Sequence, residues 1–398
     1  IALCDGRFWL LFTKNEKGRK GDAVVRSFSI TKGQRMRMID PVLLICTLIL
    51  TSCSLLTLTG TLGNVEKLTK SGYCVQIGAV VVGLAAMVVL TVIDYEELVN
   101  KFWLFFFIAS IGLLGVTLVF GTSQGTNRSY LRFGSVGIQP SEFVKASYII
   151  TFSKHLEYAK ERINSPKTLL GIGAHAGVVI GLVLASGDLG VALVYIGLTA
   201  VMLFCAGVSI WYFLGAGTLL TVAFPYLWPR LKDYQQKRIL VGFDPEKDPL
   251  GKGMQPLQSR QAIANGGIYG QGLYGGHYYK TLYASHTDFI FATFCEKFGF
   301  VGGLIVITVL VTMVIRILMI ARKAEKPCGR FICIGAAALI ILQTLENLGM
   351  CMAFLPVIGI TLPFMSYGGS SMLSMYIIIG LVQSVRAHGG KYFFEVNE

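Results

Sequence analysis

Residues 75–93 read VQIGAVVVGLAAMVVLTVI, a run of mostly apolar side chains in which no residue is charged. A stretch of about 20 apolar residues is long enough to cross the hydrocarbon core of a bilayer as one helix. Runs of the same kind recur along the chain, at Pro41–Gly60, Leu169–Ala185, Leu189–Val208 and Phe331–Leu345. The sequence therefore predicts an all-α, polytopic membrane protein.

The composition favours the same class of protein. Of the 398 residues, 54% are apolar and 14% are charged, and the mean hydropathy is +0.63. A soluble protein of this length would carry charge on about a quarter of its residues. The apolar runs, taken in order, predict about ten spans, at residues 40–60, 75–93, 102–120, 141–153, 168–186, 188–207, 209–228, 289–320, 330–354 and 367–386.

The net charge of +13 comes from 35 Lys and Arg residues against 22 Asp and Glu. Nine of the basic residues precede Pro41, four lie in Lys154–Lys167 and four in Arg322–Arg330. These clusters lie before or between apolar runs, as expected of cytoplasmic segments, and this distribution argues against nucleic-acid binding. We expect a basic cytoplasmic tail at residues 1–38, a transmembrane domain at 39–388 and a cytoplasmic tail at 389–398.

The nine cysteines and five histidines do not indicate a metal site. The cysteines lie mostly within apolar runs and show no CxxC spacing, and no two histidines form an HxxxH pair. Cysteines in such runs usually serve as small apolar residues of the core. His175, inside an apolar run, is expected to be a core residue as well.

Alternation of the predicted spans places residues 229–288 outside the membrane, as a long loop after the seventh span. Within it, Leu257–Tyr269 scatters apolar residues among polar ones, as an interfacial amphipathic helix does. The glycines that follow (Gly266, Gly267, Gly270, Gly272) allow tight turns or a close approach to a ligand. Connections of this length are usually functional or disordered, and this one is expected to be functional.

Asp288 ends this loop, in the segment Tyr283–Gly299, YASHTDFIFATFCEKFG. A carboxylate at a membrane boundary is costly to desolvate, so it persists mainly where water, substrate or a counter-charge meets it. The alternative interpretation is that Asp288 caps the helix that follows. His286, two residues earlier, is a candidate to orient the carboxylate.

Other polar side chains gather at the ends of predicted spans. Glu142 and Lys145 are three residues apart and share a helix face, so they form either a self-neutralising pair or a site in which Lys145 binds a substrate anion. Asp188 is expected to cap the helix from Leu189. Gln343 and Asn347 suit hydrogen bonds between helices.

Four motifs in this order carry a resemblance: QPSEFVK, QSRQAIANGGIYGQGL, HTDFIF and SYGGSS. Together with about ten spans and the large outer loop, the chain over residues 40–387 resembles the FtsW/RodA/SpoVE family of shape, elongation, division and sporulation proteins. The resemblance implies polymerisation of peptidoglycan glycan strands from lipid II, at the outer face of the bacterial cytoplasmic membrane. It also implies a class B penicillin-binding protein as the partner that cross-links the strands.

The family's essential aspartate matches Asp288, and its QPSE-x-x-K segment matches Gln139 to Lys145. The chain departs from the family pattern in three places. Tyr130 stands where the family usually has Trp, Lys297 in CEKFG replaces the second acid of GEELG, and Glu346 is an additional acid in QTLENLG. The segment DPLG at Asp248–Gly251 looks more like RodA than like the division-type members.

The chemistry implied by the resemblance suits one carboxylate. The sugar of lipid II sits on a diphosphate, which leaves without protonation, so the remaining task is to deprotonate the acceptor hydroxyl. We expect Asp288 to be this general base, with inversion at the anomeric carbon. For the diphosphate charge the candidates are Arg260 first, then Lys145 and Arg128, with Mg²⁺ or Mn²⁺ as a possible helper. We expect further substrate contacts from Glu142, Tyr130, Gln258, Ser259, His286 and Ser370.

Two alternatives stay open from the sequence. One is a lipid II flippase, and the other is a non-catalytic scaffold that activates a penicillin-binding protein. A flippase would place its polar groups at mid-bilayer and on both faces. Because the polar motifs of this chain gather on the outer side, the sequence favours the glycosyltransferase.

Overall fold

The structure is a computed structural model that describes residues 39–62, 69–124, 127–133, 136–230 and 233–389. The predicted tail at 1–38 lies outside the described residues, as does almost all of the one at 389–398. The described part is helical apart from one small sheet. The expectation of a helical, multi-pass membrane protein is confirmed.

Eight helices in the described ranges are long and apolar enough to cross a membrane. They are α3 (Pro41–Thr61), α4 (Lys70–Val92), α5 (Tyr95–Phe120), α7 (Pro166–Ala185), α8 (Leu189–Ala206), α13 (Ile290–Lys323), α14 (Pro327–Cys351) and α15 (Gly369–His388). The other two predicted spans correspond to α6 (Pro140–Ala159) and α9 (Ile210–Leu227). These two helices are less suited to crossing a membrane than the other eight. Helix α6 carries two acids and two lysines along its length, and the apolar part of α9, Ile210–Tyr226, is short.

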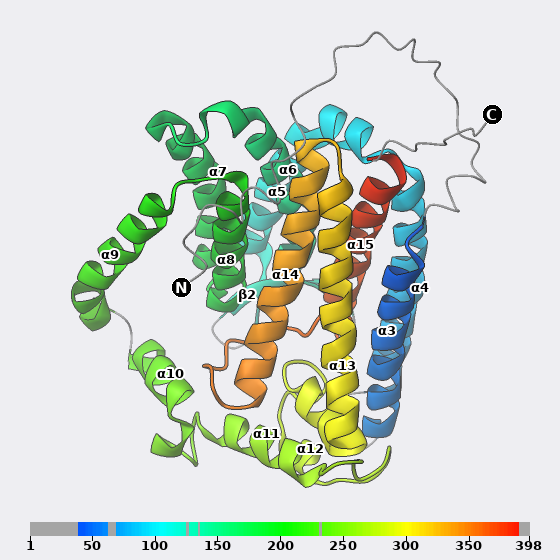
Figure 1. Cartoon of the computed structure of the whole chain (residues 1–398). Coiled ribbons are helices and arrows are strands. Elements are labelled where there is room, and N and C mark those ends of the chain that lie inside the picture. The colour runs from blue at the N-terminus through cyan, green and yellow to red at the C-terminus, as the bar shows by residue number, and fades with distance from the viewer. Residues whose placement is uncertain (1–38, 63–68, 125–126, 134–135, 231–232, 390–398) are drawn as a thin grey trace, which may run out of the picture. The chain divides into compact units, whose positions relative to one another are not determined.

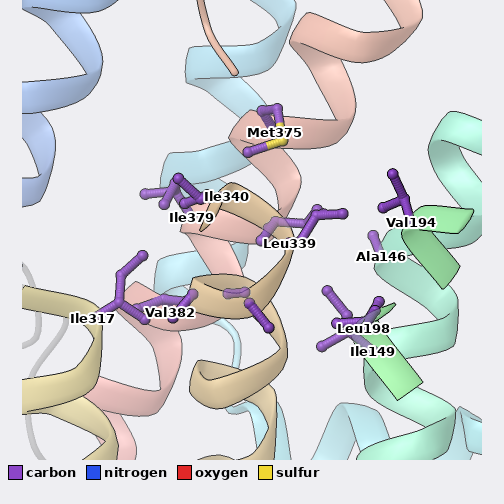
Figure 2. Packing of buried hydrophobic residues seen from close by; sticks show 14 of the residues in the cluster. Ala146, Ile149, Val194, Leu198, Ile317, Leu339, Ile340, Met375, Ile379 and Val382 are labelled. Atoms are coloured by element: carbon purple, nitrogen blue, oxygen red, sulfur yellow. The ribbon is translucent and has the colours of Figure 1, made fainter. Parts of the chain in front are cut away.

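The core forms around α14, which packs against α6 and α8 on one side and against α13 and α15 on the other (Figure 1). Figure 2 shows the apolar side chains at this junction, with Leu339 of α14 between Ile149 of α6 and Met375 of α15. Interdigitated branched side chains of this kind fill the interior at the density of an organic crystal. The inner helices therefore hold the polar ends of the bundle in fixed positions.

Close packing of α4 on α15 depends on two glycines. A Cβ at Gly83 of α4 would lie 2.5 Å from the ring of Tyr376, and a Cβ at Gly380 of α15 would lie 3.0 Å from the backbone of Met87. Tyr376 is fully buried, and its hydroxyl shares a hydrogen bond of 2.7 Å with Thr51 of α3. Small residues at such crossings let helices approach closely in a bilayer.

Helix α13 is broken at Gly299, whose φ of 70° and ψ of −169° are not helical. A Cβ there would lie 2.4 Å from the backbone of Gly270 and Ile268, so only glycine fits. The N–H of Phe300 donates to the carbonyl of Gly267 at 2.8 Å, so the glycine-rich segment satisfies backbone groups that the break releases. The single span predicted at 289–320 is therefore a short segment before Gly299 and a longer one after it.

The two charged residues before this break also fix the long loop predicted at residues 229–288. Glu296 is fully buried and accepts hydrogen bonds from the backbone N–H groups of residues 277–279 at 2.8 to 3.0 Å. Lys297 donates from Nζ to the carbonyls of Gly60, at 3.1 Å, and Leu273, at 2.7 Å. The lysine that departs from the family pattern thus ties α3 and the loop to α13.

The long loop predicted at residues 229–288 contains short helices rather than irregular chain: α10 (Asp233–Phe243), α11 (Met254–Asn265) and α12 (Tyr278–Thr281). The predicted amphipathic helix at Leu257–Tyr269 corresponds to α11, which begins three residues earlier and ends before the glycines. Three short turns complete the helical elements: η1 (Lys160–Arg162), η2 (Trp228–Arg230) and η3 (Pro245–Lys247).

The sequence did not predict the small antiparallel sheet between α5 and α6. It has the order β1–β2–β3, formed by Thr122–Gln124, Asn127–Phe133 and Val136–Ile138. Leu131 pairs with Ile138 in this sheet, and Thr122 pairs with Tyr130. The sheet sets the position of Tyr130, which belongs to the site described below.

We predict that Gly83→Ala lowers the stability of the protein. The added methyl group would overlap the Tyr376 ring, and overpacking of this kind costs about 1–3 kcal/mol. Gly78→Ala is the matched control, because a Cβ at Gly78 of α4 meets nothing within 4 Å. Thermal unfolding in detergent measures both variants, and equal unfolding temperatures would contradict the proposed crossing.

Candidate active site

Asp288 lies in the turn Tyr283–Phe289, directly before α13, and is half-buried. Three hydroxyl or backbone donors hold the carbonyls of residues 285–287. Thr293 donates from Oγ1 to residue 285 at 2.8 Å, the N–H of Tyr367 donates to residue 286 at 2.9 Å, and Ser366 donates from Oγ to residue 287 at 2.7 Å. The turn that carries Asp288 is thereby attached to both α13 and the chain before α15.

Asn347 of α14 fixes Asp288 itself. Its Nδ2 donates to the carbonyl of Asp288 at 2.8 Å and to the carbonyl of Ile360 at 2.7 Å. Asn347 is fully buried. Asn347 was predicted to form a hydrogen bond between helices, but it instead binds two non-helical segments. These two hydrogen bonds hold the turn before α13 next to the chain before α15.

Gly359 approaches the Asp288 carboxylate from the opposite segment. Its φ is 76°, a left-handed conformation that favours glycine, and a Cβ there would lie 3.3 Å from Oδ2 of Asp288. The same segment is packed tightly against α8, because a Cβ at Gly190 would lie 2.5 Å from the carbonyl oxygen of Ile358. The backbone around Gly359 therefore forms one side of the space around the carboxylate.

Asp288 lines a cavity of about 370 Å³. The polar side chains in its wall come from six segments of the chain, most of them far apart in the sequence. They are Ser129, Tyr130, Gln139, Glu142, Lys145, Asp188, Tyr283, Thr287, Asp288, Gln343, Thr361, Tyr367, Ser370 and Ser371.

Of the residues predicted from the sequence, Asp288, Glu142, Lys145, Tyr130 and Ser370 line this one cavity. Apolar surface is also present in the wall, at the side chains of α8 and of the segment before α15. A concave site with a few convergent polar groups is the usual form of a small-molecule site.

Glu142 and Lys145 form the pair that their spacing suggests. Lys145 Nζ lies 2.6 Å from Glu142 Oε1, and both side chains are almost fully buried. The positive charge of a buried ammonium is largely neutralised by an adjacent carboxylate. The structure therefore favours the self-neutralising pair over a free cation at Lys145, although both residues reach the cavity.

Asp188 has two roles. It caps α8, accepting from the N–H of Val191 at 3.1 Å, and it also accepts from Nε2 of Gln139 at 3.2 Å within the cavity wall. Burial raises the pKa of the Asp188 carboxyl above its ordinary value. The predicted cap is present, and the cavity-facing position of this carboxylate was not predicted.

Tyr130, which replaces the usual Trp, lies on β2 and lines the cavity. Burial raises the pKa of its phenol above the ordinary value, so the hydroxyl keeps its proton and can donate a hydrogen bond. An aromatic ring with a donor at its edge is therefore retained at this position.

Four predicted contacts lie outside the cavity wall. Arg260 of α11 is exposed and pairs with Glu246 at 3.2 Å. Gln258 accepts from Gln255 at 3.3 Å, and Ser259 is buried and donates to the carbonyl of Cys351 at 2.8 Å.

The ring of His286, the fourth, packs against the ring of Tyr367 with centroids 5.5 Å apart. His286 is buried, so its ring contributes to the support behind the turn that carries Asp288. The backbone of Arg128 belongs to β2, and its side chain lies outside the described residues.

Sequence reasoning missed the segment between α14 and α15 as part of the site. It contributes Ile358, Gly359, Ile360 and Thr361 to the cavity wall. The available signal was the Pro and Gly content of PVIGITLPF, at residues 356–364, which interrupts two apolar runs where a lipid-exposed loop would be unfavourable.

We predict that Asn347→Leu destabilises the protein by about 1–3 kcal/mol for each backbone carbonyl that loses its donor. Asn164→Leu is the control. Asn164 also joins two backbone groups, of Gly207 and Ser209, but it is exposed, so water can replace it. If Asn347→Leu lowers the unfolding temperature by less than Asn164→Leu does, the proposed role of Asn347 is contradicted.

Comparison with known proteins gives a consistent result. A model of the FtsW/RodA/SpoVE family, described as cell cycle proteins, matches residues 36–391. The chain is 34% identical to the probable peptidoglycan glycosyltransferase FtsW of Geobacter metallireducens over 316 residues, which cover 77% of this chain and 82% of the relative. It is 34% identical to the peptidoglycan glycosyltransferase MrdB of Escherichia coli over 322 residues, 79% of this chain and 85% of the relative.

A solved structure gives the same relationship. It is a chain from a study of how a peptidoglycan synthase complex coordinates polymerisation and crosslinking. The two chains are 27% identical and superpose with a TM-score of 0.75, over 87% of this chain and 97% of the other. The family match extends over nearly the whole sequence. The chain therefore belongs to the FtsW/RodA/SpoVE family.

Proposed function

We propose that this family member, a peptidoglycan glycosyltransferase, polymerises lipid II into glycan strands with Asp288 as its general base. The glycosyltransferase class follows from the family and from relatives of that name. The finer assignment rests chiefly on one observation: Asp288 reaches a polar cavity from a backbone held by Asn347. This is the arrangement that a positioned base requires.

In the proposed reaction, the Asp288 carboxylate takes the proton of a sugar hydroxyl in the acceptor. The hydroxyl oxygen then forms a bond to the anomeric carbon of the donor, while the bond from that carbon to the diphosphate oxygen breaks. The electron pair of the broken bond leaves with the polyprenyl diphosphate, and the configuration at the anomeric carbon inverts. One carboxylate is enough because the leaving group needs no acid, in contrast to most glycosidases.

The rigidity of the turn supports this role. Donors from α13, α14 and the segment before α15 hold the backbone of residues 285–288. A base that is fixed within hydrogen-bond reach of its substrate contributes to rate because orientation is settled before the reaction begins. The same constraint keeps the carboxylate next to Gly359.

For the diphosphate, Arg260 remains the first proposed cation. Its pair with Glu246 is exposed, with side-chain exposures of 55% and 72%, and such pairs contribute only about 0–1 kcal/mol. An incoming diphosphate can therefore replace the glutamate at little cost. Lys145 is a weaker candidate because Glu142 already compensates it.

A divalent cation, Mg²⁺ or Mn²⁺, is the proposed helper in charge neutralisation. Among the described residues, no group of three or more His, Cys, Asp or Glu side chains is placed to hold a metal ion. The described protein residues alone therefore do not fit a resident metal. Such a cation would depend on the diphosphate oxygens of the substrate as ligands.

We further propose the bacterial cytoplasmic membrane as the location, with both termini in the cytoplasm, and a class B penicillin-binding protein as partner. The multi-pass character follows from the apolar helices. The basic clusters at Lys154–Lys167 and Arg322–Arg330 support the orientation. The similarity to a chain of a complex that polymerises and crosslinks supports a cross-linking partner.

We predict that Asp288→Asn reduces glycan polymerisation from labelled lipid II by about 100- to 10,000-fold, as expected for loss of a general base. Purified protein with a class B penicillin-binding protein provides the assay. Asp244→Asn is the control, because Asp244 is an exposed outer-loop acid paired with Lys247. Equal polymerisation by wild type and Asp288→Asn would remove Asp288 as the base, and transfer of lipid II across liposomes without polymer would favour a flippase.

We also predict that Gly359→Ala slows polymerisation at least tenfold. The methyl group would press on Asp288 Oδ2 at 3.3 Å, and misplacement of a base is costly. Gly272→Ala is the control that distinguishes the effect of this contact from the effect of backbone strain. Gly272 has a φ of 85°, close to the 76° of Gly359, and a Cβ there meets nothing within 4 Å. Both variants should lose similar stability, and a rate loss of the same size in both would refute the Asp288 contact.

A further inference from the structure

The charged groups of the cavity wall are mostly acidic. Three of the lining residues carry carboxylates (Glu142, Asp188 and Asp288), and one, Lys145, carries an amine. The amine is already engaged by Glu142 at 2.6 Å. A diphosphate that entered this space would meet like charge without a free counter-charge from the lining residues. The part of the substrate that occupies the cavity is therefore expected to be uncharged.

Apart from the hydroxyl of Ser129, two buried side-chain oxygens in the same wall have no hydrogen-bond partner in the described part of the chain. They are Oε2 of Glu142, on α6, and Oε1 of Gln343, on α14. The two residues are 3% and 1% exposed, and α6 and α14 pack directly against each other. Buried acceptors are almost always paired, so an unpaired one in a native structure calls for an explanation. Here both residues line the cavity, where a ligand can supply the donor.

We propose that Glu142 and Gln343, which we call the acceptor wall, form the subsite for the uncharged sugar whose hydroxyl Asp288 deprotonates. A sugar of this class offers hydroxyl and acetamido N–H donors, and it carries no charge. In a disaccharide linked to diphosphate, the sugar at the far end can enter the cavity while the diphosphate stays outside. This inference rests on the proposed function and adds the substrate group that the site selects.

The assignment also explains why Gln343 is retained at a buried position. A buried amide oxygen without a donor destabilises the ligand-free protein, so we expect replacement of Gln343 by an apolar side chain of similar shape to be neutral or stabilising. A residue that serves only the fold would behave in the opposite way. Substrate binding and protein stability should therefore respond to the loss of this amide in opposite directions.

The test uses Gln343→Met, which keeps the length of the side chain and removes the amide. In the complete protein, we expect an unchanged or higher unfolding temperature without ligand and a KM for lipid II raised about tenfold or more, with a smaller effect on kcat. Leu345→Met is the control on the same helix, because Leu345 is 61% exposed and faces away from the core. A lower unfolding temperature, or an unchanged KM, for Gln343→Met would overturn the proposal.

A binding measurement distinguishes this inference from the proposed function. A soluble N-acetylated disaccharide should protect wild type against heat and protect Gln343→Met less, whether or not polymer is formed. If wild type polymerises lipid II and both proteins are protected equally, the subsite is wrong and the function stands. If wild type neither polymerises nor is protected, both fail. Inorganic pyrophosphate, whose proposed contact Arg260 lies outside the cavity wall, should protect wild type and Gln343→Met to the same extent, and weaker protection of Gln343→Met by pyrophosphate would also overturn the assignment.

Discussion

The constraint on which the site depends is the need to satisfy backbone polar groups in non-helical segments at the end of a membrane bundle. An unpaired peptide group costs several kcal/mol in a medium without water. Buried side chains meet this need here: Asn347 binds the carbonyls of Asp288 and Ile360, and Gln76 binds the backbone of residues 366 and 368. These bonds convert two irregular segments into a rigid frame, and that frame is what positions a carboxylate at the cavity.

Much of the helical architecture could be predicted, because a bilayer requires long apolar runs and the sequence displays them directly. The Glu142–Lys145 pair was also accessible, since three-residue spacing on a helix places two side chains on one face. Asp288 was accessible for a different reason: an acid at the mouth of an apolar run is unusual enough to mark a position. In each case the physical signal lies within a few residues of the chain.

The remaining parts of the site depend on contacts between distant segments, which one sequence does not reveal. The break at Gly299 exists because the glycine-rich segment docks on α13, and Lys297 is useful only because Gly60 and Leu273 present carbonyls to it. In the same way, Arg260 suggested a phosphate contact by its position in the loop, whereas the structure pairs it with Glu246 outside the cavity wall.

The arrangement of polar groups along the bundle favours synthesis over transport. At the opposite end from Asp288, the buried carboxylate of Asp40 binds Arg316, at 2.7 Å, and Arg386, so its charge is compensated where the helices converge. Arg316 follows the break of α13 at Gly299 by several helical turns, roughly 26 Å at 1.5 Å per residue. Between the two ends, the packed apolar side chains of Figure 2 fill the centre. A headgroup would have to open this layer to cross, whereas a reaction at the cavity leaves it intact.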